Sequence, residues 1–298
     1  MKYRKLGKSL LEVSEISFGC MSFGPDESEN KRLVEKAING GINLFDTADM
    51  YSHGENETIL GKALKSLRKN VILATKVGNQ WRPDKSGYDW NPGKKYILGE
   101  VENSLKRLQT DYIDLYQLHG GTIGDPIDET IEAFEILKTQ GKIRYYGISS
   151  IRPNVIREYI KRSSITSVMM QYSLLDRRPE EACFPILSEA GIGVLVRGSI
   201  GKGLLAGKPA DQFLKYNKLE VHGAANAIKS ISSENRNEMQ TAVNYVLRHQ
   251  LVSSVVVGIR TEEQLDGALA VPDTMPLTAH EIEYLNQILH QNFYEEHR

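Results

Sequence analysis

The feature that most constrains the fold of this chain is the alternation of short apolar runs with longer segments of helical period. Short apolar runs predict buried strands, and apolar residues three and four apart, as at Leu98, Val101, Leu105 and Leu108, predict helices with one apolar face. Such an alternation closes most simply into a parallel (β/α)8 barrel, the TIM barrel of the α/β class, because a closed sheet has no free edge. The eight expected strands are Glu15–Cys20, Ile42–Phe45, Val71–Thr75, Tyr112–Leu118, Ile143–Ile148, Ile165–Met170, Gly193–Arg197 and Ser253–Val257.

The length of the chain agrees with such a barrel. A (β/α)8 barrel takes about 250 residues before insertions, so 298 residues predict one domain over 1–298. Met1–Val13 predicts a hairpin that plugs the barrel bottom, and a helix is expected near the C-terminus. Lys208–Asn235 is polar without a clear period, which predicts a long mobile loop over the barrel top. An open doubly wound sheet is the main alternative, but the GxGxxG turn that it requires does not follow Cys20.

The composition narrows the function classes. The formal charge of -1 gives no field that would attract nucleic acid or an anionic membrane, so a small-molecule partner is expected. Met1–Leu10 carries charges throughout and lacks the apolar stretch of a signal peptide, which makes the cytoplasm the expected location. Cys20 and Cys183 fit no metal or disulfide pattern; we expect both to be small buried apolar side chains, with oxidation of either as the alternative.

Polar side chains follow three consecutive expected strands. Asp46 follows the second strand and is itself followed by Tyr51, Lys76 ends the third strand, and His119 ends the fourth. The chemistry of a parallel barrel lies at the carboxyl-terminal ends of its strands, so these four side chains are expected to meet. A lysine ammonium favours the ionised form of a nearby phenol, a carboxylate holds that lysine charged, and a histidine N–H orients a carbonyl oxygen. The set therefore suits proton transfer to a carbonyl group that is being reduced.

The motifs around these residues resemble those of the aldo-keto reductase superfamily. They are F-D-T-A-D-M-Y, A-T-K and L-Y-Q-L-H, and the resemblance continues through G-K-I-R-Y-Y-G-I-S-S, Q-Y-S-L-L, G-K-G-L-L-A-G-K and V-G-I-R-T-E-E-Q-L. It covers nearly the whole chain and resembles most the bacterial members. It implies a reductase in which Tyr51 is the general acid, Lys76 and Asp46 tune it, and His119 positions the carbonyl.

The resemblance also implies a bound cofactor, NADPH or NADP+, extended across the barrel top, because no protein group can donate hydride. Gly19, Met21 and Asp46 are then expected near the nicotinamide ribose, and Ser149, Ser150 and Gln171 at the carboxamide. The loop Gly198–Leu204, with Gly198, Ser199, Ile200, Lys202 and Gly203, should meet the diphosphate through its backbone amides. Gly258 and Arg260 should meet the 2′-phosphate at a helix N-terminus, which favours NADPH over NADH.

Several of these positions have a second interpretation. Ser149 and Ser150 are equally typical of a helix cap, and Gln264 closes a capping box with Thr261 as well as being a candidate cofactor ligand. Arg197 stands where the family often has an aromatic residue that packs on the nicotinamide. Its guanidinium can stack there or pair with the diphosphate, and the neighbouring glycines favour the diphosphate. Gly198-Ser199-Ile200 and Ala268 also depart from the common family pattern, which predicts a weaker grip on the adenine.

Two other functions remain as alternatives. Lys76 at a strand end also fits the Schiff-base lysine of an aldolase, which borohydride trapping with substrate would reveal. Potassium-channel β-subunits share this fold and motif set while acting largely as binding partners, and steady NADPH oxidation with aldehydes would separate an enzyme from such a module. The motifs concern the reaction, whereas the loops determine the substrate, and neither indicates an oligomeric state.

Overall fold

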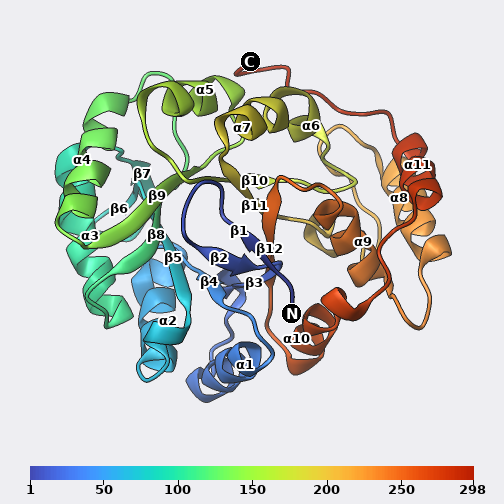
Figure 1. The fold of residues 1–298 in the computed structure, drawn as a ribbon, viewed down its shortest axis with the longest axis horizontal. Helices are drawn as coiled ribbons and strands as arrows, with labels where there is room; N and C mark the ends of the chain where they lie inside the picture. Colours follow the sequence, from blue (N-terminus) through green and yellow to red (C-terminus); the bar gives the residue numbers. More distant parts are fainter.

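Eight parallel strands close into a barrel in the computed structural model, which describes residues 1–298 (Figure 1). Their order around the barrel is β10-β11-β12-β3-β4-β5-β8-β9, so each strand pairs with the next barrel strand along the chain and the last pairs with the first. The predicted (β/α)8 fold is confirmed, and each expected apolar run supplies one strand. The barrel strands are β3 (Ile16–Gly19), β4 (Leu44–Asp46), β5 (Ile72–Val77), β8 (Ile113–Leu118), β9 (Ile143–Ser149), β10 (Ser167–Gln171), β11 (Gly193–Arg197) and β12 (Val252–Gly258).

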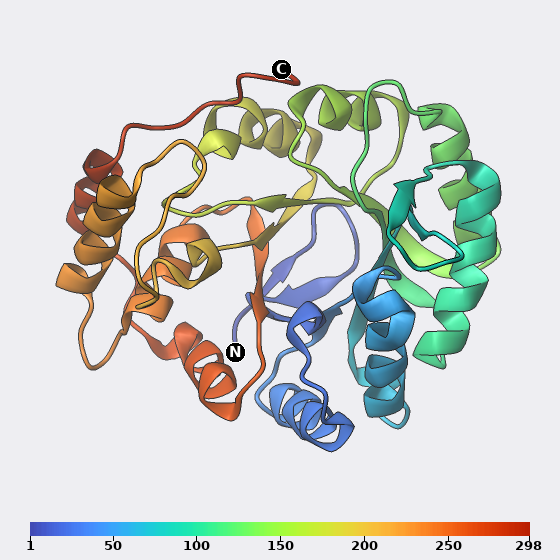
Figure 2. The same cartoon turned by 180° about the vertical axis from the view of Figure 1, so that it is seen from behind.

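The helices form a ring around the barrel, which Figures 1 and 2 show from opposite sides. They are α1 (Glu27–Asn39), α2 (Glu55–Leu64), α3 (Lys94–Leu108), α4 (Ile127–Thr139), α5 (Pro153–Arg162), α6 (Arg178–Ala182), α7 (Phe184–Ala190), α8 (Lys218–Ile231), α9 (Glu238–Leu247), α10 (Glu262–Leu269) and α11 (Ala279–Ile288). Short 3-10 turns are η1 (Cys20–Ser22), η2 (Tyr51–Gly54), η3 (Arg68–Asn70), η4 (Gly201–Gly203) and η5 (Val271–Asp273). The predicted C-terminal helix is α11. No helix is both long and apolar enough to cross a membrane.

The N-terminal hairpin plugs the barrel as predicted. Its strands β1 (Tyr3–Lys5) and β2 (Glu12–Ser14) pair antiparallel, and Figure 1 shows it across the barrel opening. Leu6, Leu11 and Val13 are buried against inward-facing side chains of the barrel strands, among them Leu44 and Leu115. This burial removes apolar surface from water at the end of the barrel opposite the strand ends that carry the candidate site.

The prediction of a mobile loop over Lys208–Asn235 is wrong for half of that segment, because residues Lys218–Ile231 form helix α8. The Asn217 side chain caps the helix by accepting hydrogen bonds from the backbone N–H groups of Leu219 and Glu220, and the Glu220 carboxylate accepts one from the Asn217 N–H. The helix buries Val221, Ala224, Ala227 and Ile228. Two of these four buried residues are alanines, which give only a weak apolar signal, and polar residues lie between them. The helical period of the segment is therefore not evident in the sequence. Figure 1 shows α8 beside α11.

A second feature that the apolar pattern did not predict is the hairpin β6 (Asn79–Trp81) and β7 (Tyr88–Trp90), which follows β5.

Both cysteines are buried and free, which confirms their expected apolar environment. Their burial raises the pKa of each thiol, so neither carries thiolate character at neutral pH.

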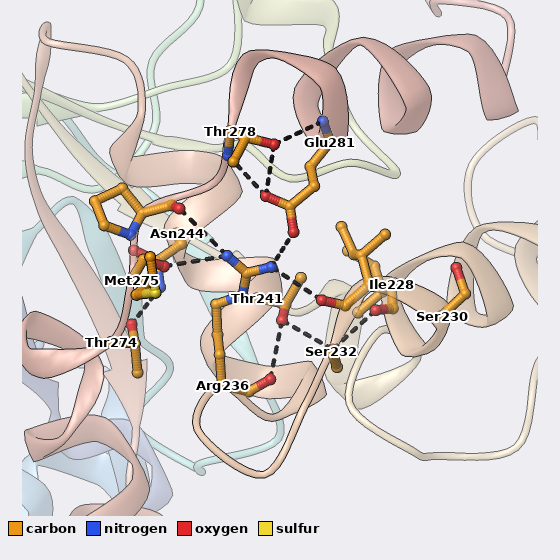
Figure 3. Close-up of polar contacts among 12 residues, drawn as sticks. Ile228, Ser230, Ser232, Arg236, Thr241, Asn244, Thr274, Met275, Thr278 and Glu281 are labelled. Atoms are coloured by element: carbon orange, nitrogen blue, oxygen red, sulfur yellow. Dashed lines mark hydrogen bonds and ion pairs between the residues drawn. The ribbon is translucent and has the colours of Figure 1, made fainter.

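Arg236, in the loop between α8 and α9, links that loop to the end of α8, to the segment before α11 and to α11 itself (Figure 3). Its guanidinium donates to the carbonyls of Ile231 at the end of α8 and of Met275 and Pro276 before α11, at 2.9, 3.1 and 3.3 Å. It also pairs with Glu281, which closes the capping box of α11 with Thr278. Arg236 is only 7% exposed, so these partners replace water for a nearly buried charge.

Replacement of Arg236 by Met is expected to destabilise the fold by about 3 kcal/mol, because it leaves a carboxylate and three carbonyls without their donor. Urea denaturation measures the change. The matched control is Lys62→Met, which breaks the exposed pair with Glu27 and should cost at most about 1 kcal/mol. Equal losses in the two variants would contradict this account of the Arg236 cluster.

Candidate active site

A cavity of about 950 Å³ opens at the carboxyl-terminal ends of the barrel strands, where the sequence predicts the site. Of the sequence-predicted residues, the cavity is lined by Gly19, Met21, Asp46, Tyr51, Lys76, His119, Ser149, Ser150, Gln171, Arg197, Gly198, Ser199, Ile200, Lys202 and Gly258. Gly203, Arg260 and Gln264 are outside the lining. The cavity thus brings together side chains from all eight strands or the loops that follow them.

Lys76 links the polar side chains at the centre of the cavity. Its Nζ donates to Asp46 Oδ2 at 2.7 Å, to the Thr47 carbonyl at 2.7 Å and to Tyr51 Oη at 3.4 Å. Lys76 is 1% exposed and Asp46 5%. Strands β4 and β5 pair side by side, and this pairing places Asp46 next to the end of β5. Burial disfavours the charged ammonium, but Asp46 and Tyr51 outweigh this effect and raise the pKa of Lys76. The lysine is therefore a fixed positive charge beside the Tyr51 hydroxyl.

His119 also lies beside Tyr51, with the two ring centroids 5.8 Å apart in an edge-on arrangement. Burial, together with the charges of Lys76 and Arg197, lowers the pKa of His119 to about 3. The imidazole is therefore neutral at physiological pH and carries a single ring N–H. A neutral imidazole can donate one hydrogen bond to a carbonyl oxygen without competing with Tyr51 as an acid.

The turn that carries Tyr51 is held from outside the cavity. Ser52 and His53 adopt left-handed backbone conformations, with φ of 48° and 56°, which cost side-chain-bearing residues free energy. Trp81 of β6 donates from Nε1 to the Met50 carbonyl at 3.1 Å, and its ring lies 3.8 Å from that of His53. Trp81 of the unpredicted β6–β7 hairpin thus contacts this turn both before Tyr51, at Met50, and after it, at His53.

The strand ends on the far side of the cavity carry amide and hydroxyl groups. Ser150 Oγ accepts the backbone N–H of Arg152 at 3.2 Å, and Ser149 Oγ makes no hydrogen bond within the protein. The N-cap of α5 is Arg152, and no side chain caps this helix, so the capping interpretation of Ser149 and Ser150 is wrong. Gln171 donates to Asp176 at 2.8 Å and accepts from Arg197 Nη1 at 3.0 Å. Arg197 therefore lies against Gln171 at the end of the neighbouring strand.

Two backbone regions near the rim offer hydrogen-bond donors. In the loop after β11, the N–H groups of Ser199 and Ile200 have no acceptor within the protein. At the start of α10, Gln264 Oε1 accepts the N–H groups of Arg260 and Thr261 at 2.8 and 3.3 Å, so the predicted capping box is present. Arg260 Nε donates to the carbonyl of Ser22, which lines the cavity, at 3.1 Å.

The sequence analysis missed part of the cavity wall. The missed lining includes Ser22, Met50, Gly120, Gly121, Ile151, Arg152, Arg178, Lys215 and the C-terminal segment Phe293–His297. Figures 1 and 2 show this segment running from α11 past α6 and α7 toward α5. The carbonyl of His297 accepts the Asn154 N–H of α5 at 2.8 Å. Arg152 lies four residues beyond the predicted strand Ile143–Ile148, so its position gives only a weak signal. Nothing in the C-terminal sequence indicates the place of Phe293–His297.

Comparison with known proteins gives the family of this chain. The model of the Aldo/keto reductase family matches residues 15–290. The chain is 48% identical, over an alignment of 307 positions that covers 100% of both proteins, to the uncharacterized oxidoreductase YqkF of Bacillus subtilis (strain 168). The holo form of aldo-keto reductase AKR11C1 from Bacillus halodurans matches with a TM-score of 0.94 at 50% identity, and its apo form with 0.85 at 47%; each match covers 100% of this chain and 99% of the other. The chain therefore belongs to the aldo/keto reductase family of oxidoreductases.

Proposed function

We propose that the chain is an NADPH-dependent reductase that converts an aldehyde or ketone to an alcohol. The observation that carries this proposal is the Lys76 ammonium, which bridges Asp46 at 2.7 Å and Tyr51 at 3.4 Å inside the cavity. When bound, the nicotinamide supplies hydride to the carbonyl carbon. Tyr51 gives its hydroxyl proton to the carbonyl oxygen, so the product is a neutral alcohol.

The neighbouring residues support that proton transfer. The charge of Lys76 stabilises the phenolate that Tyr51 becomes, and Asp46 compensates the buried ammonium. His119 donates its ring N–H to the carbonyl oxygen and so fixes the substrate with its oxygen toward Tyr51. Trp81, which does not line the cavity, holds the turn that aims the Tyr51 hydroxyl.

The lining fits a nicotinamide dinucleotide. Asp46 Oδ1 is buried without a hydrogen-bond partner at the centre of the cavity, where a ribose hydroxyl would satisfy it. A Cβ at Gly198 would meet Gln171 at 3.3 Å, and the φ of 72° there favours glycine, so this strand end leaves its backbone open to a ligand. The residues proposed to line the nicotinamide end are Gly19, Met21, Asp46, Ser149, Ser150 and Gln171.

The rim fits the phosphates of the same cofactor. The free N–H groups of Ser199 and Ile200, with Lys202 beside them, would hold the diphosphate. Gly258, Arg260 and the start of α10 would hold the 2′-phosphate, with Gly203 and Gln264 at the edge of the site. The higher TM-score of the chain with the holo form of AKR11C1 than with its apo form supports an arrangement ready to bind a cofactor.

The geometry around Lys76 argues against the aldolase alternative. A Schiff base forms only from the neutral amine, whereas Asp46 and Tyr51 raise the pKa of Lys76. Incubation with aldehyde and borohydride should therefore leave Lys76 unmodified.

Arg197 is expected to affect the two redox forms of the cofactor differently. The guanidinium lies against Gln171, and its charge helps to lower the pKa of His119; both neighbours belong to the nicotinamide end of the cavity. This placement favours stacking of Arg197 on the nicotinamide over the contact with the diphosphate that the neighbouring glycines suggest.

A stacked cation repels the positively charged ring of NADP+, so Arg197→Tyr should increase the affinity for NADP+ by about two- to fivefold and leave the affinity for NADPH unchanged. Fluorescence titration with both forms measures this; equal weakening of both would instead assign Arg197 to the diphosphate.

A panel of aldehydes and ketones tests the proposed function. The purified protein should consume NADPH only when a carbonyl compound is present and should form one alcohol for each NADPH oxidised. NADPH binding without turnover of any compound would favour the binding-module alternative instead.

A further inference from the structure

The cavity contains more positive charge than its proposed cofactor contacts require. Six basic side chains line it: Lys76, Arg152, Arg178, Arg197, Lys202 and Lys215. Three of them form ion pairs with carboxylates: Lys76–Asp46, Arg178–Asp176 and Lys215–Glu295. Arg197 and Lys202 are assigned to the cofactor by the proposed function. Arg152 is the remaining cation, and no carboxylate lies within ion-pair distance of it.

The guanidinium of Arg152 has one partner in the protein, the carbonyl of Gly121. A guanidinium carries five N–H donors in a planar fork, so most of its hydrogen-bonding capacity is unused. Arg152 is only partly buried and lines the cavity, and its remaining side-chain donors have no acceptor within the protein. A partly desolvated fork without a carboxylate is suited to bind a planar anion from outside the protein.

The position of Arg152 is on the substrate side of the cavity. Gly121, which holds the guanidinium, follows His119 by two residues, and His119 is the residue proposed to orient the reacting carbonyl. The proposed phosphate contacts lie on the loops after β11 and β12, whereas Arg152 lies between the loop after β8 and the start of α5. The carbonyl of His297 accepts from Asn154, so the C-terminal segment closes the wall beside this position.

The acidic side chains of that wall leave Arg152 unneutralised. Glu295 is paired with Lys215. The side chain of Glu296 is 85% exposed, and its nearest basic group is His297 at 3.7 Å. An anion that enters beside His119 therefore meets Arg152 without displacing an internal ion pair.

We propose that Arg152 is a substrate-binding residue and that the preferred substrates are aldehydes or ketones with a carboxylate remote from the reacting carbonyl. The inference rests on the proposed function and deepens it. His119 and Tyr51 bind the carbonyl end, while the Arg152 fork binds the carboxylate end. Two fixed points hold the substrate in one orientation over the site of hydride transfer.

The test compares pairs of straight-chain aldehydes of equal length, in which one member ends in a carboxylate and the other in a methyl group. The measured quantity is the ratio of their kcat/KM values, carboxylate over methyl. Arg152→Gln should lower this ratio by about tenfold to a hundredfold, the effect of one charge-assisted contact. The loss should appear in the KM of the carboxylate compound, with the affinity for NADPH and the methyl aldehyde unchanged. Arg152→Lys should restore part of the ratio, because it keeps the charge and loses the fork.

Arg157→Gln is the matched control, because Arg157 lies on α5, the helix that Arg152 precedes, is exposed and does not line the cavity. It should leave the ratio unchanged. Reduction of the methyl aldehydes with a ratio that Arg152→Gln does not change would overturn this inference alone. If no aldehyde of any pair is reduced, the proposed function fails and this inference fails with it.

Discussion

Replacement of Tyr51 by Phe is expected to lower the turnover of carbonyl reduction by at least about 10²–10⁴-fold, the usual contribution of general acid catalysis. The variant loses only the hydroxyl that receives the Lys76 hydrogen bond at 3.4 Å, and it keeps the ring beside His119. NADPH affinity should therefore survive. Steady-state rates measure the loss, and fluorescence titration measures the affinity.

Tyr88→Phe is the control for this variant. Tyr88 is half-exposed in β7, packs on Trp81 and does not line the cavity, so removal of its hydroxyl should leave turnover within about twofold, as for most surface substitutions. Near-normal reduction by the Tyr51→Phe enzyme would show that another group supplies the proton.

Replacement of Arg260 by Ala is expected to weaken NADPH by about tenfold to a hundredfold while NADH changes little. One charge-assisted contact to a phosphate is worth about 1.5–3 kcal/mol, and only NADPH carries the 2′-phosphate. Arg260 stands at the start of α10, where Gln264 already satisfies the backbone N–H groups of Arg260 and Thr261. The Arg260 side chain is thus the only charged donor among the groups proposed to hold this phosphate. Titration of the variant with both cofactors measures the selectivity.

Arg32→Ala provides the matched control, because Arg32 is an exposed arginine that pairs with Glu262 at the same helix end. It should change the affinities for NADPH and NADH equally and only slightly. Equal weakening of both cofactors by Arg260→Ala would remove Arg260 from the 2′-phosphate site.

The barrel could be predicted because its signals are local. Each strand is a short apolar run and most helices show a three- and four-residue period, so strand number and order follow from the sequence alone. Helix α8 was not predicted, because alanine forms much of its buried face and polar residues separate its apolar positions. The β6–β7 hairpin was not predicted, because its strands have three residues each and are partly exposed, so they show almost no apolar pattern.

The centre of the site could be predicted because parallel strands end at one rim. Asp46, Lys76 and His119 each lie at or beside the end of a strand, so topology alone brings them together around Tyr51. The remaining wall depends on contacts between distant parts of the chain. Phe293–His297 reaches the cavity through bonds to α5 and α6, such as the pair Arg298–Glu181, and no short-range pattern encodes that path. Burial and charge pairing, which single out Arg152, likewise exist only in the folded chain.

Transfer of deuterium from labelled NADPH tests the central claim most directly. NADPH that carries deuterium on one or the other face of the reactive nicotinamide carbon is incubated with the protein and an aldehyde, and the alcohol is analysed by mass spectrometry. The account predicts one deuterium on the former carbonyl carbon from one of the two labelled forms and none from the other, with both reactions slowed strongly in Tyr51→Phe. An alcohol without deuterium from either form, or no alcohol at all, would contradict it.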